Sequence, residues 1–266
     1  LIPFVGFLIL ISSPRIFPEL FYNPNDVPFM TSIIIFLYFA NSYIKKSSRK
    51  NLFLLTFASG FLISMRFGGI VFPGLFILIY LFYNYFILKK SFISNIKILI
   101  LFSFFLFFFT YLLNPSMWGN LTHTLIVLFK TTISYDLEFP KFLYLNEFHD
   151  IRNLPWHYLP VWIGISTPLF YLILIFIGMS VFLINFKKKL NRDNSDFFDL
   201  FIFFVLIFCF LAAVLITKSI INGWRHMYFL YPLLIYFSLF SFKLIKWRKF
   251  LLFLFMFSFS FNCYWM

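Results

Sequence analysis

Charged residues are scarce in this chain of 266 residues. Only 12% of its residues are Asp, Glu, Lys or Arg and only nine are acidic, whereas 62% are hydrophobic. The mean hydropathy is +0.92. A soluble globular domain carries about 25% charged residues. The composition therefore excludes a soluble domain and predicts an integral membrane protein.

Cysteine is nearly absent as well. The two cysteines, Cys209 and Cys263, both lie inside apolar runs, and neither has a second potential metal ligand nearby. A disulfide framework or a metal site needs several such residues at defined spacings. The sequence therefore predicts neither a disulfide nor a metal site, and it indicates no cofactor.

The positive charge of the chain is gathered in short segments. The formal net charge is +13, and fifteen of the 22 Lys and Arg residues form four clusters between apolar runs. The clusters are Lys45, Lys46, Arg49 and Lys50; Lys89, Lys90 and Lys97; Lys187, Lys188, Lys189 and Arg192; and Lys243, Lys246, Arg248 and Lys249. Basic loops of this kind orient membrane helices with the lysines on the cytoplasmic side. The charge therefore indicates membrane orientation and not a nucleic-acid partner.

Apolar runs of spanning length predict eight or nine transmembrane helices. They cover about residues 1–12, 28–44, 51–65, 70–88, 96–113, 160–184, 199–217, 227–243 and 250–266. The predicted fold class is therefore all-α, a polytopic membrane protein with a loop region on its outer face. Because the sequence begins and ends inside apolar runs, we expect residues 1–266 to be a single transmembrane domain that is truncated at both ends.

Four segments face outward if all four basic clusters are cytoplasmic. They are residues 13–28, a tight turn at 66–69, a long loop at 114–159 and the segment 217–226. Within the long loop, residues 121–135 can form an amphipathic helix on the membrane surface. Six of the nine acidic residues and all four histidines lie in these segments: Glu19, Asp26, Asp136, Glu138, Glu147, Asp150, His123, His149, His157 and His226. This concentration predicts an active site at the outer membrane boundary.

Five short motifs follow one another along the chain. They are Ser13-Pro14-Arg15 with Phe21-Tyr22-Asn23-Pro24-Asn25-Asp26-Val27-Pro28-Phe29, Arg66-Phe67-Gly68-Gly69, Asn114-Pro115-Ser116-Met117-Trp118, Leu154-Pro155-Trp156-His157-Tyr158-Leu159-Pro160 and Gly223-Trp224-Arg225-His226. In this order the chain resembles bacterial multi-pass glycosyltransferases of the GT-C class. The most similar group is the dolichyl-phosphate-mannose protein mannosyltransferase and aminoarabinose transferase-like superfamily.

The resemblance implies a membrane-bound glycosyltransferase. Such an enzyme transfers a sugar from a polyprenyl-phosphate donor to a lipid, glycan or protein acceptor, with inversion at the anomeric carbon. It acts on the periplasmic face of the bacterial inner membrane. Members carry an acidic residue in the first outer loop, and this sequence lacks that loop, so we expect the residue most often assigned as the base to lie outside residues 1–266.

Three arginines are predicted at the outer boundary, where the phosphate of a lipid-linked sugar would lie. They are Arg15, Arg66 and Arg225, and a guanidinium holds phosphate by paired hydrogen bonds. Arg66 lies between two short apolar runs, so it is either a phosphate ligand or a residue that snorkels to the interface. His226 is a candidate proton donor or phosphate ligand, and simple anchoring of Arg225 and His226 at the boundary is the alternative.

Asp26 is the best-placed carboxylate for acid–base chemistry. In an inverting transfer, a carboxylate removes the proton of the acceptor hydroxyl as the hydroxyl attacks the sugar. The same residue can also cap the helix that follows it, and the two roles can coexist. Glu19 is a weaker candidate for this role and is interpreted as a solvated loop charge. Asp26, Arg66 and Arg225 are predicted to line one cavity.

The end of the long loop is rich in aromatic and titratable residues. Glu147, His149 and Asp150 form too small a group for a metal site, and this loop is predicted to contact the acceptor or to close over the donor. Trp118, Trp156, Tyr158 and Trp162 are typical of an interfacial aromatic belt, with stacking of Trp156 on a sugar ring as an alternative. The predicted substrate-binding residues are Glu147, Asp150, Trp156, His157 and Tyr158.

Two other classes of protein remain open. A multi-pass transporter or a flippase for lipid-linked sugars would show helices broken at mid-membrane depth and ionisable residues inside its spans. A structural membrane subunit would give no role to Arg66 and the outer carboxylates.

Overall fold

The computed structural model describes residues 2–133, 141–150, 154–186, 194–215, 223–243 and 248–265. Helices make up about 81% of the structure, so the predicted all-α fold class is confirmed, with one short β-hairpin added. The chain divides into two compact units, which are described separately. Unit 1 is Leu1–Val27, Phe139–Leu190 and Leu206–Met266, and unit 2 is Pro28–Glu138 and Asn191–Val205.

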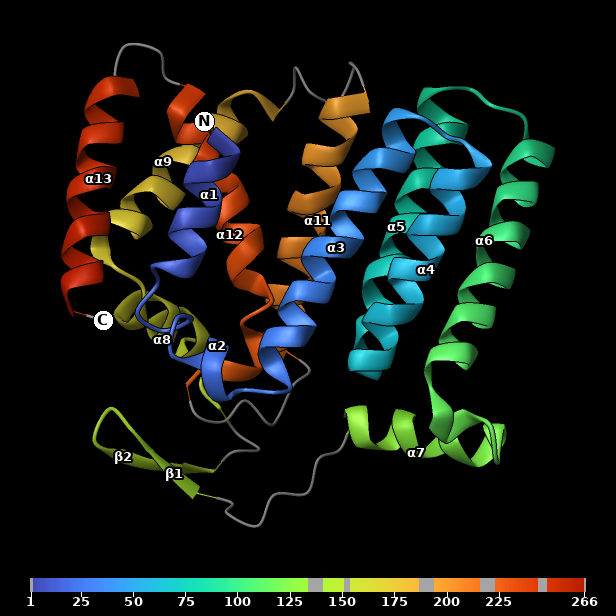
Figure 1. Ribbon diagram of the computed structural model, residues 1–266, viewed down its shortest axis with the longest axis horizontal. Helices are drawn as coiled ribbons and strands as arrows, with labels where there is room; N and C mark the ends of the chain where they lie inside the picture. Colours follow the sequence, from blue (N-terminus) through green and yellow to red (C-terminus); the bar gives the residue numbers. More distant parts are fainter. Residues whose placement is uncertain are drawn as a thin grey trace. The chain divides into compact units, whose positions relative to one another are not determined.

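Unit 2 is built mainly from consecutive antiparallel helices (Figure 1). Its elements are α3 (Asp26–Lys45), α4 (Arg49–Met65), η1 (Phe67–Ile70), α5 (Val71–Phe82), η2 (Tyr83–Ile87), α6 (Phe92–Leu113), η3 (Pro115–Met117), α7 (Leu121–Ile133) and the first part of α11 (Asn194–Leu215). Each apolar run predicted over residues 28–113 is thus a helix. The predicted tight turn at 66–69 is the short helix η1.

Close helix contacts and aromatic rings form the core of unit 2. A Cβ atom added at Gly60 of α4 would lie 2.6 Å from the Cβ of Phe109 in α6, so only glycine permits this approach of the two helices. Small residues have this role at helix interfaces in membranes, where backbones pack closely. Phe36 of α3 meets the rings of Phe76 in α5 and Phe201 in α11 edge-on, at centroid distances of 6.2 and 6.5 Å.

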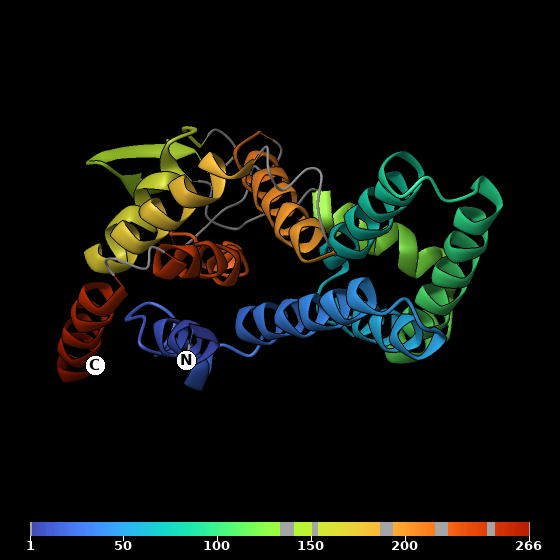
Figure 2. The same cartoon turned by 90° about the horizontal axis from the view of Figure 1, so that it is seen from above.

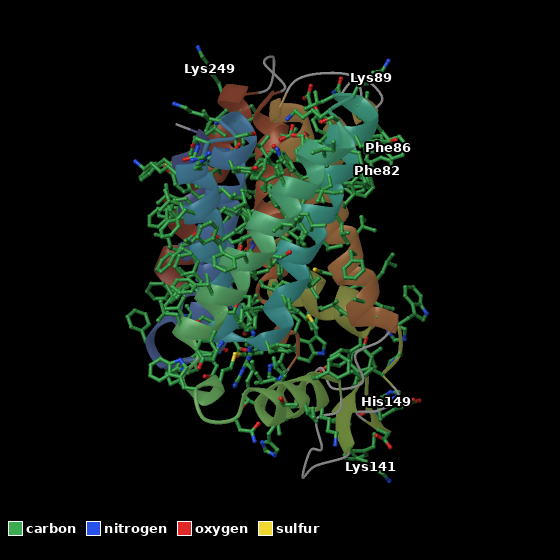
Figure 3. All side chains as sticks on the ribbon, turned by 90° about the vertical axis from the view of Figure 1, so that its right-hand side faces the viewer. Phe82, Phe86, Lys89, Lys141, His149 and Lys249 are labelled. Atoms are coloured by element: carbon green, nitrogen blue, oxygen red, sulfur yellow. The ribbon has the colours of Figure 1, made fainter. Side chains whose placement is uncertain are left out.

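The two basic clusters of unit 2 lie at one end of its helices. Lys45 ends α3 and Lys89 follows η2, and both connections lie at the end of unit 2 opposite to η1 and α7 (Figure 1). Figure 3 shows Phe82 and Phe86 projecting from the side of unit 2 next to Lys89, and both rings are largely exposed. This arrangement of exposed rings and terminal lysines is the one expected of helices that cross a membrane.

Helix α7 confirms the helix predicted at 121–135 as far as Ile133, and residues 134–140 lie outside the described part of the chain. Figure 1 shows α7 lying crosswise below the ends of α5 and α6, and Figure 2 shows α6 at the outer edge of unit 2. An amphipathic helix in this orientation suits the plane of a membrane surface.

Four helical segments of the described chain are long and apolar enough to cross a membrane. They are Asp26–Lys45, Phe67–Ile87, Phe92–Leu113 and Asp196–Val214. Shorter apolar helices cover Ile2–Ile11, Leu121–Thr131, Leu169–Ile184 and Leu230–Phe242. These segments are consistent with a membrane protein, and the predicted total of eight or nine spans stays a prediction.

Unit 1 combines the start, the middle and the end of the chain. Its elements are α1 (Ile2–Ile11), α2 (Glu19–Tyr22), β1 (Lys141–Tyr144), β2 (Glu147–Asp150), α8 (Tyr158–Ser166), α9 (Leu169–Ile184), the second part of α11, η5 (Arg225–Met227), α12 (Leu230–Ser238), η6 (Leu239–Lys243) and α13 (Arg248–Trp265). Strands β1 and β2 form an antiparallel hairpin in which Tyr144 pairs with Glu147. Helix α12 packs on α1 and α9.

The run predicted as one span at 160–184 is two helices, α8 and α9, and this corrects the prediction. Pro168 has no backbone N–H, and a proline disfavours helical geometry in the residue before it. Thr167 is accordingly extended, with φ −101° and ψ 131°, and it ends α8. The chain therefore turns between Ser166 and Leu169.

The polar elements of unit 1 gather at one end. Figure 1 shows the end of α1, helix α2, helix α8, the hairpin and the start of α12 at the same end of this unit. Figure 3 shows Lys249 at the opposite end, away from Lys141 and His149 of the hairpin. The prediction that the titratable loops oppose the lysine-rich ends therefore holds for the described residues of unit 1, and the cluster at 187–192 lies outside them.

Candidate functional site

A buried carboxylate, Asp26, lies at the centre of the polar end of unit 1. Its side chain is only 2% exposed, and its Oδ2 atom accepts a hydrogen bond of 2.7 Å from Nε of Arg225. The Nδ1 atom of His226 lies 3.6 Å from the other carboxylate oxygen, Oδ1. Asp26 is also the first residue of α3, where the helix dipole favours negative charge. These contacts stabilise an ionised carboxylate that is nearly sealed from solvent.

Asn23 organises the turn that leads into α3. Its Oδ1 atom accepts hydrogen bonds from the backbone N–H groups of Asn25 (3.2 Å) and Asp26 (2.9 Å). Its Nδ2 group donates to Oδ2 of Asp26 at 2.8 Å. Helix α3 begins at Asp26, and the side chain of Asn23 accepts from its first N–H group. The prediction that Asp26 caps this helix stays a prediction.

Glu19 is a second buried carboxylate, and its interpretation as a solvated loop charge is wrong. The residue is 5% exposed. Its Oε2 atom accepts a bond of 2.6 Å from Nδ2 of Asn23, and its Oε1 atom accepts a bond of 3.0 Å from the hydroxyl of Tyr228. Asn23 thus bridges Glu19 and Asp26. Burial raises the pKa of Tyr228 well above its usual value, so this hydroxyl remains a donor.

The Gly-Trp-Arg-His motif is turned toward Asp26 by its first two residues. Gly223 has φ +71°, which favours glycine, and a Cβ atom there would lie 3.1 Å from the ring of Trp162. Trp224 is buried and donates from Nε1 to Oγ of Ser166 at 2.6 Å. With its indole anchored, the short helix η5 presents Arg225 to the carboxylate.

Arg15 and Tyr158 lie in the same part of unit 1. The Cζ atom of Arg15 is 5.7 Å from the ring centroid of Tyr228, a cation–π arrangement. Burial raises the pKa of Tyr158, while a hydrogen bond with the Gly223 backbone and the charge of Arg15 act in the opposite direction. The cluster thus contains two arginines and two carboxylates, whose formal charges cancel.

The hairpin brings the other predicted substrate-binding residues close to α8. The hydroxyl of Tyr144 lies 2.9 Å from Nδ1 of His157, and its ring lies 4.9 Å from that of Tyr158. Burial raises the pKa of Tyr144. Three further predicted residues, Glu147, Asp150 and Trp156, are exposed side chains. The structure thus joins His157 and Tyr158 through Tyr144 and leaves the other three on the surface.

Arg66 belongs to unit 2. It ends α4, and its Cζ atom lies 5.5 Å from the ring centroid of Phe29. Asp26 and Arg225, two of the three residues predicted to share a cavity, are thus in direct contact within unit 1. The prediction that Arg66 lines the same cavity stays a prediction.

The chemical capacity of the site lies in two half-exposed side chains, the guanidinium of Arg225 and the imidazole of His226. The side chains of Arg225 and His226 are 35% and 33% exposed, whereas Asp26 behind them is closed off. A guanidinium held through Nε can still offer its Nη groups to an anion. Within the described ranges, no three His, Cys, Asp or Glu side chains converge as metal ligands.

Asn23 and Tyr228 are the site residues that the sequence did not single out, and Glu19 was only a weaker candidate. Glu19, Asn23 and Asp26 are spaced by four and three residues, the spacing at which side chains share one helical face, and Arg225 and Tyr228 are also three apart. That spacing was the available signal. Asp136, Glu138 and residues 217–222 lie outside the described part of the chain.

Comparisons with known proteins leave the family open. No protein-family model, no curated protein and no solved structure matches this chain. The function is therefore inferred from the residues of the site.

Proposed function

We propose that this protein is a membrane glycosyltransferase of the GT-C class that uses a polyprenyl-phosphate sugar. The observation that carries the proposal is the pair of Arg225 and Asp26: a guanidinium 35% exposed, held at 2.7 Å by a carboxylate only 2% exposed. A buried carboxylate fixes the geometry of an arginine, and a fixed arginine binds phosphate by paired hydrogen bonds. The donor phosphate is the substrate group that such a site fits.

In the proposed reaction, Arg225 holds the phosphate, and Asp26 fixes Arg225 and lies beside the imidazole of His226. The oxygen of the acceptor hydroxyl attacks the anomeric carbon from the face opposite the phosphate. The bond between the anomeric carbon and the phosphate oxygen breaks, and polyprenyl phosphate leaves with the electron pair while Arg225 neutralises its charge.

His226 takes the proton of the acceptor hydroxyl in this reaction. Asp26 is closed to a substrate hydroxyl in this arrangement, whereas His226 is 33% exposed and has its Nδ1 atom 3.6 Å from Asp26. The negative charge of a carboxylate at this distance stabilises the imidazolium that forms. Asp26, which the sequence favours as the base, thus supports Arg225 and His226 in this proposal. Arg15, 5.7 Å from the ring centroid of Tyr228, adds positive charge.

The proposed site faces the outside of a bacterial inner membrane. The polar end of unit 1 lies opposite Lys249, and lysine-rich ends are cytoplasmic. The exposed Trp156 and hairpin residues Glu147 and Asp150 would contact the acceptor, which can be a lipid, a glycan or a protein. In unit 2, Arg66 and its aromatic partner Phe29 provide a second candidate for phosphate binding.

The test is a transfer assay with the full-length protein reconstituted in lipid vesicles and offered several polyprenyl-phosphate sugars. We expect one sugar to be released from its lipid and to appear on an acceptor. His226→Gln should lower the rate about 100-fold or more, the usual contribution of a general base. His123→Gln changes an exposed histidine of α7 and is the matched control. Release of no sugar, or equal rates for the two variants, would overturn the proposal.

A transporter or flippase of lipid-linked sugars is the second candidate. The observation that favours it is the interruption between α8 and α9 at Thr167 and Pro168, since broken helices form many transporter sites. The same vesicles distinguish the two functions. Movement of the intact lipid-linked sugar across the bilayer, without cleavage of its phosphate bond, would identify a transporter.

A further inference from the structure

A cavity of about 730 Å³ lies in unit 1 beside the junction of α8 and α9. Helix α13 and the segment after α1 complete its walls. Apolar side chains dominate the lining, and they include Pro14, Leu169, Phe257 and Phe261. Three of these side chains are strongly exposed, so the cavity opens at the surface as a groove. A cavity with apolar walls favours a hydrocarbon chain as its occupant.

Two polar groups in this cavity have unmet hydrogen-bonding capacity. Thr167 and Asn262 line it and are 5% and 7% exposed. Neither Oγ1 of Thr167 nor Nδ2 of Asn262 has a hydrogen-bond partner among the described residues. Thr167 lies at the break before Pro168, and its extended backbone removes it from the helical geometry in which a threonine hydroxyl bonds the preceding turn.

The two donors define the chemistry of the occupant. A buried polar group without a partner is costly, so the ligand should supply an acceptor at this depth. A polyprenyl chain has no polar atom along its hydrocarbon. An acyl chain linked through an ester does, because its carbonyl oxygen has two lone pairs and can accept from a hydroxyl and an amide together.

The position of the groove agrees with this chemistry. Figure 1 shows α8 and the C-terminal part of α13 at the same end of unit 1 as the hairpin. Ester carbonyls of membrane lipids lie at the boundary between the headgroups and the hydrocarbon, which is where the ends of spanning helices are found. The groove also adjoins the candidate site, since Ser166 in its wall accepts the hydrogen bond from Trp224, next to Arg225.

We infer that this groove binds an ester-linked acyl chain of a membrane lipid, with Thr167 and Asn262 donating to its carbonyl oxygen. The site is separate from the proposed contact between Arg225 and phosphate, and it does not depend on the transferase activity.

The experiment compares two lipids that differ only in the carbonyl. The delipidated full-length protein in detergent is titrated with phosphatidylglycerol carrying either ester-linked palmitoyl chains or ether-linked hexadecyl chains, and bound lipid is counted by native mass spectrometry. We expect the ester lipid to bind about tenfold more tightly, which corresponds to about 1.4 kcal/mol. The double variant Thr167→Val/Asn262→Leu should lose this preference while keeping its affinity for the ether lipid, which shows that the groove remains folded.

Ser180→Ala is the matched control, because Ser180 is on the exposed side of α9 and donates to the carbonyl of Phe176. It should retain the tenfold preference. Equal affinities of the unaltered protein for the two lipids would overturn the inference, as would an ester preference that survives in the double variant. Displacement of the ester lipid by an equal concentration of polyprenyl phosphate would assign the groove to the isoprenoid chain instead and would also overturn it.

Discussion

The contact between Asp26 and Arg225 makes a quantitative prediction about stability and activity. Asp26→Asn keeps the shape of the side chain and removes its charge. A hydrogen bond to a charged group contributes about 1.5–3 kcal/mol and a neutral one about 1 kcal/mol. Negative charge in the first turn of a helix adds about 0.3–1 kcal/mol. Because Arg225 is 35% exposed and water replaces part of the interaction, we expect a loss of about 2 kcal/mol in the free energy of unfolding.

A double-mutant cycle separates this interaction from general damage. Denaturant unfolding in detergent micelles is measured for the wild type, for Asp26→Asn, for Arg225→Gln and for the double variant. We expect a coupling energy of about 1 kcal/mol between the two positions. The same cycle with Arg49→Gln, an exposed arginine at the start of α4, should give no coupling. Sugar transfer by Asp26→Asn should fall about 100-fold because His226 loses the carboxylate charge that stabilises its imidazolium. Zero coupling, or unchanged turnover, would refute the reasoning.

The remaining predictions concern stability. Tyr228→Phe should cost about 1–3 kcal/mol of unfolding free energy, because the buried carboxylate of Glu19 loses a donor. Burial raises the pKa of Tyr228 in the folded protein. The hydroxyl therefore contributes its full stabilisation below the ordinary tyrosine pKa of 10.0, and this stabilisation is lost as the pH rises above that value. Denaturant unfolding of the wild type and of Tyr228→Phe at increasing alkaline pH measures the loss. Gly178→Ala should prevent close packing of α9 on α12, because the added Cβ atom would collide with the backbone carbonyl of Phe237. Thermal unfolding of this variant should therefore occur at a clearly lower temperature.

Matched variants control these two substitutions. Tyr22→Phe changes an exposed tyrosine and should leave stability within about 0.5 kcal/mol of the wild type. Gly164→Ala adds a methyl group where nothing lies within 4 Å, so it should be tolerated in α8. A Gly178→Ala variant as stable as Gly164→Ala would contradict the packing of α9 against α12.

Much of the fold follows from local sequence. Hydrophobic runs must form helices in an apolar environment, because every backbone N–H and C=O group needs a partner within the segment. That rule and the basic clusters predicted the helices, the turn at Arg66 and the separation of lysines from titratable loops. They did not predict the break in the run at 160–184, although Pro168 was a visible signal of it.

The sequence by itself determined many of the candidate residues, among them Asp26 and Arg225, and which end of the helices they occupy, because hydropathy and the positions of Lys and Arg are local properties. Only the tertiary structure decided which candidates meet. Arg225 is 199 positions from Asp26 along the chain, and Tyr228 is 209 from Glu19. Such pairs depend on how α1, α2 and α12 pack, and no local pattern encodes that packing. Burial likewise depends on distant segments, which is why Glu19 was read as a solvated charge and is instead enclosed beside Asp26.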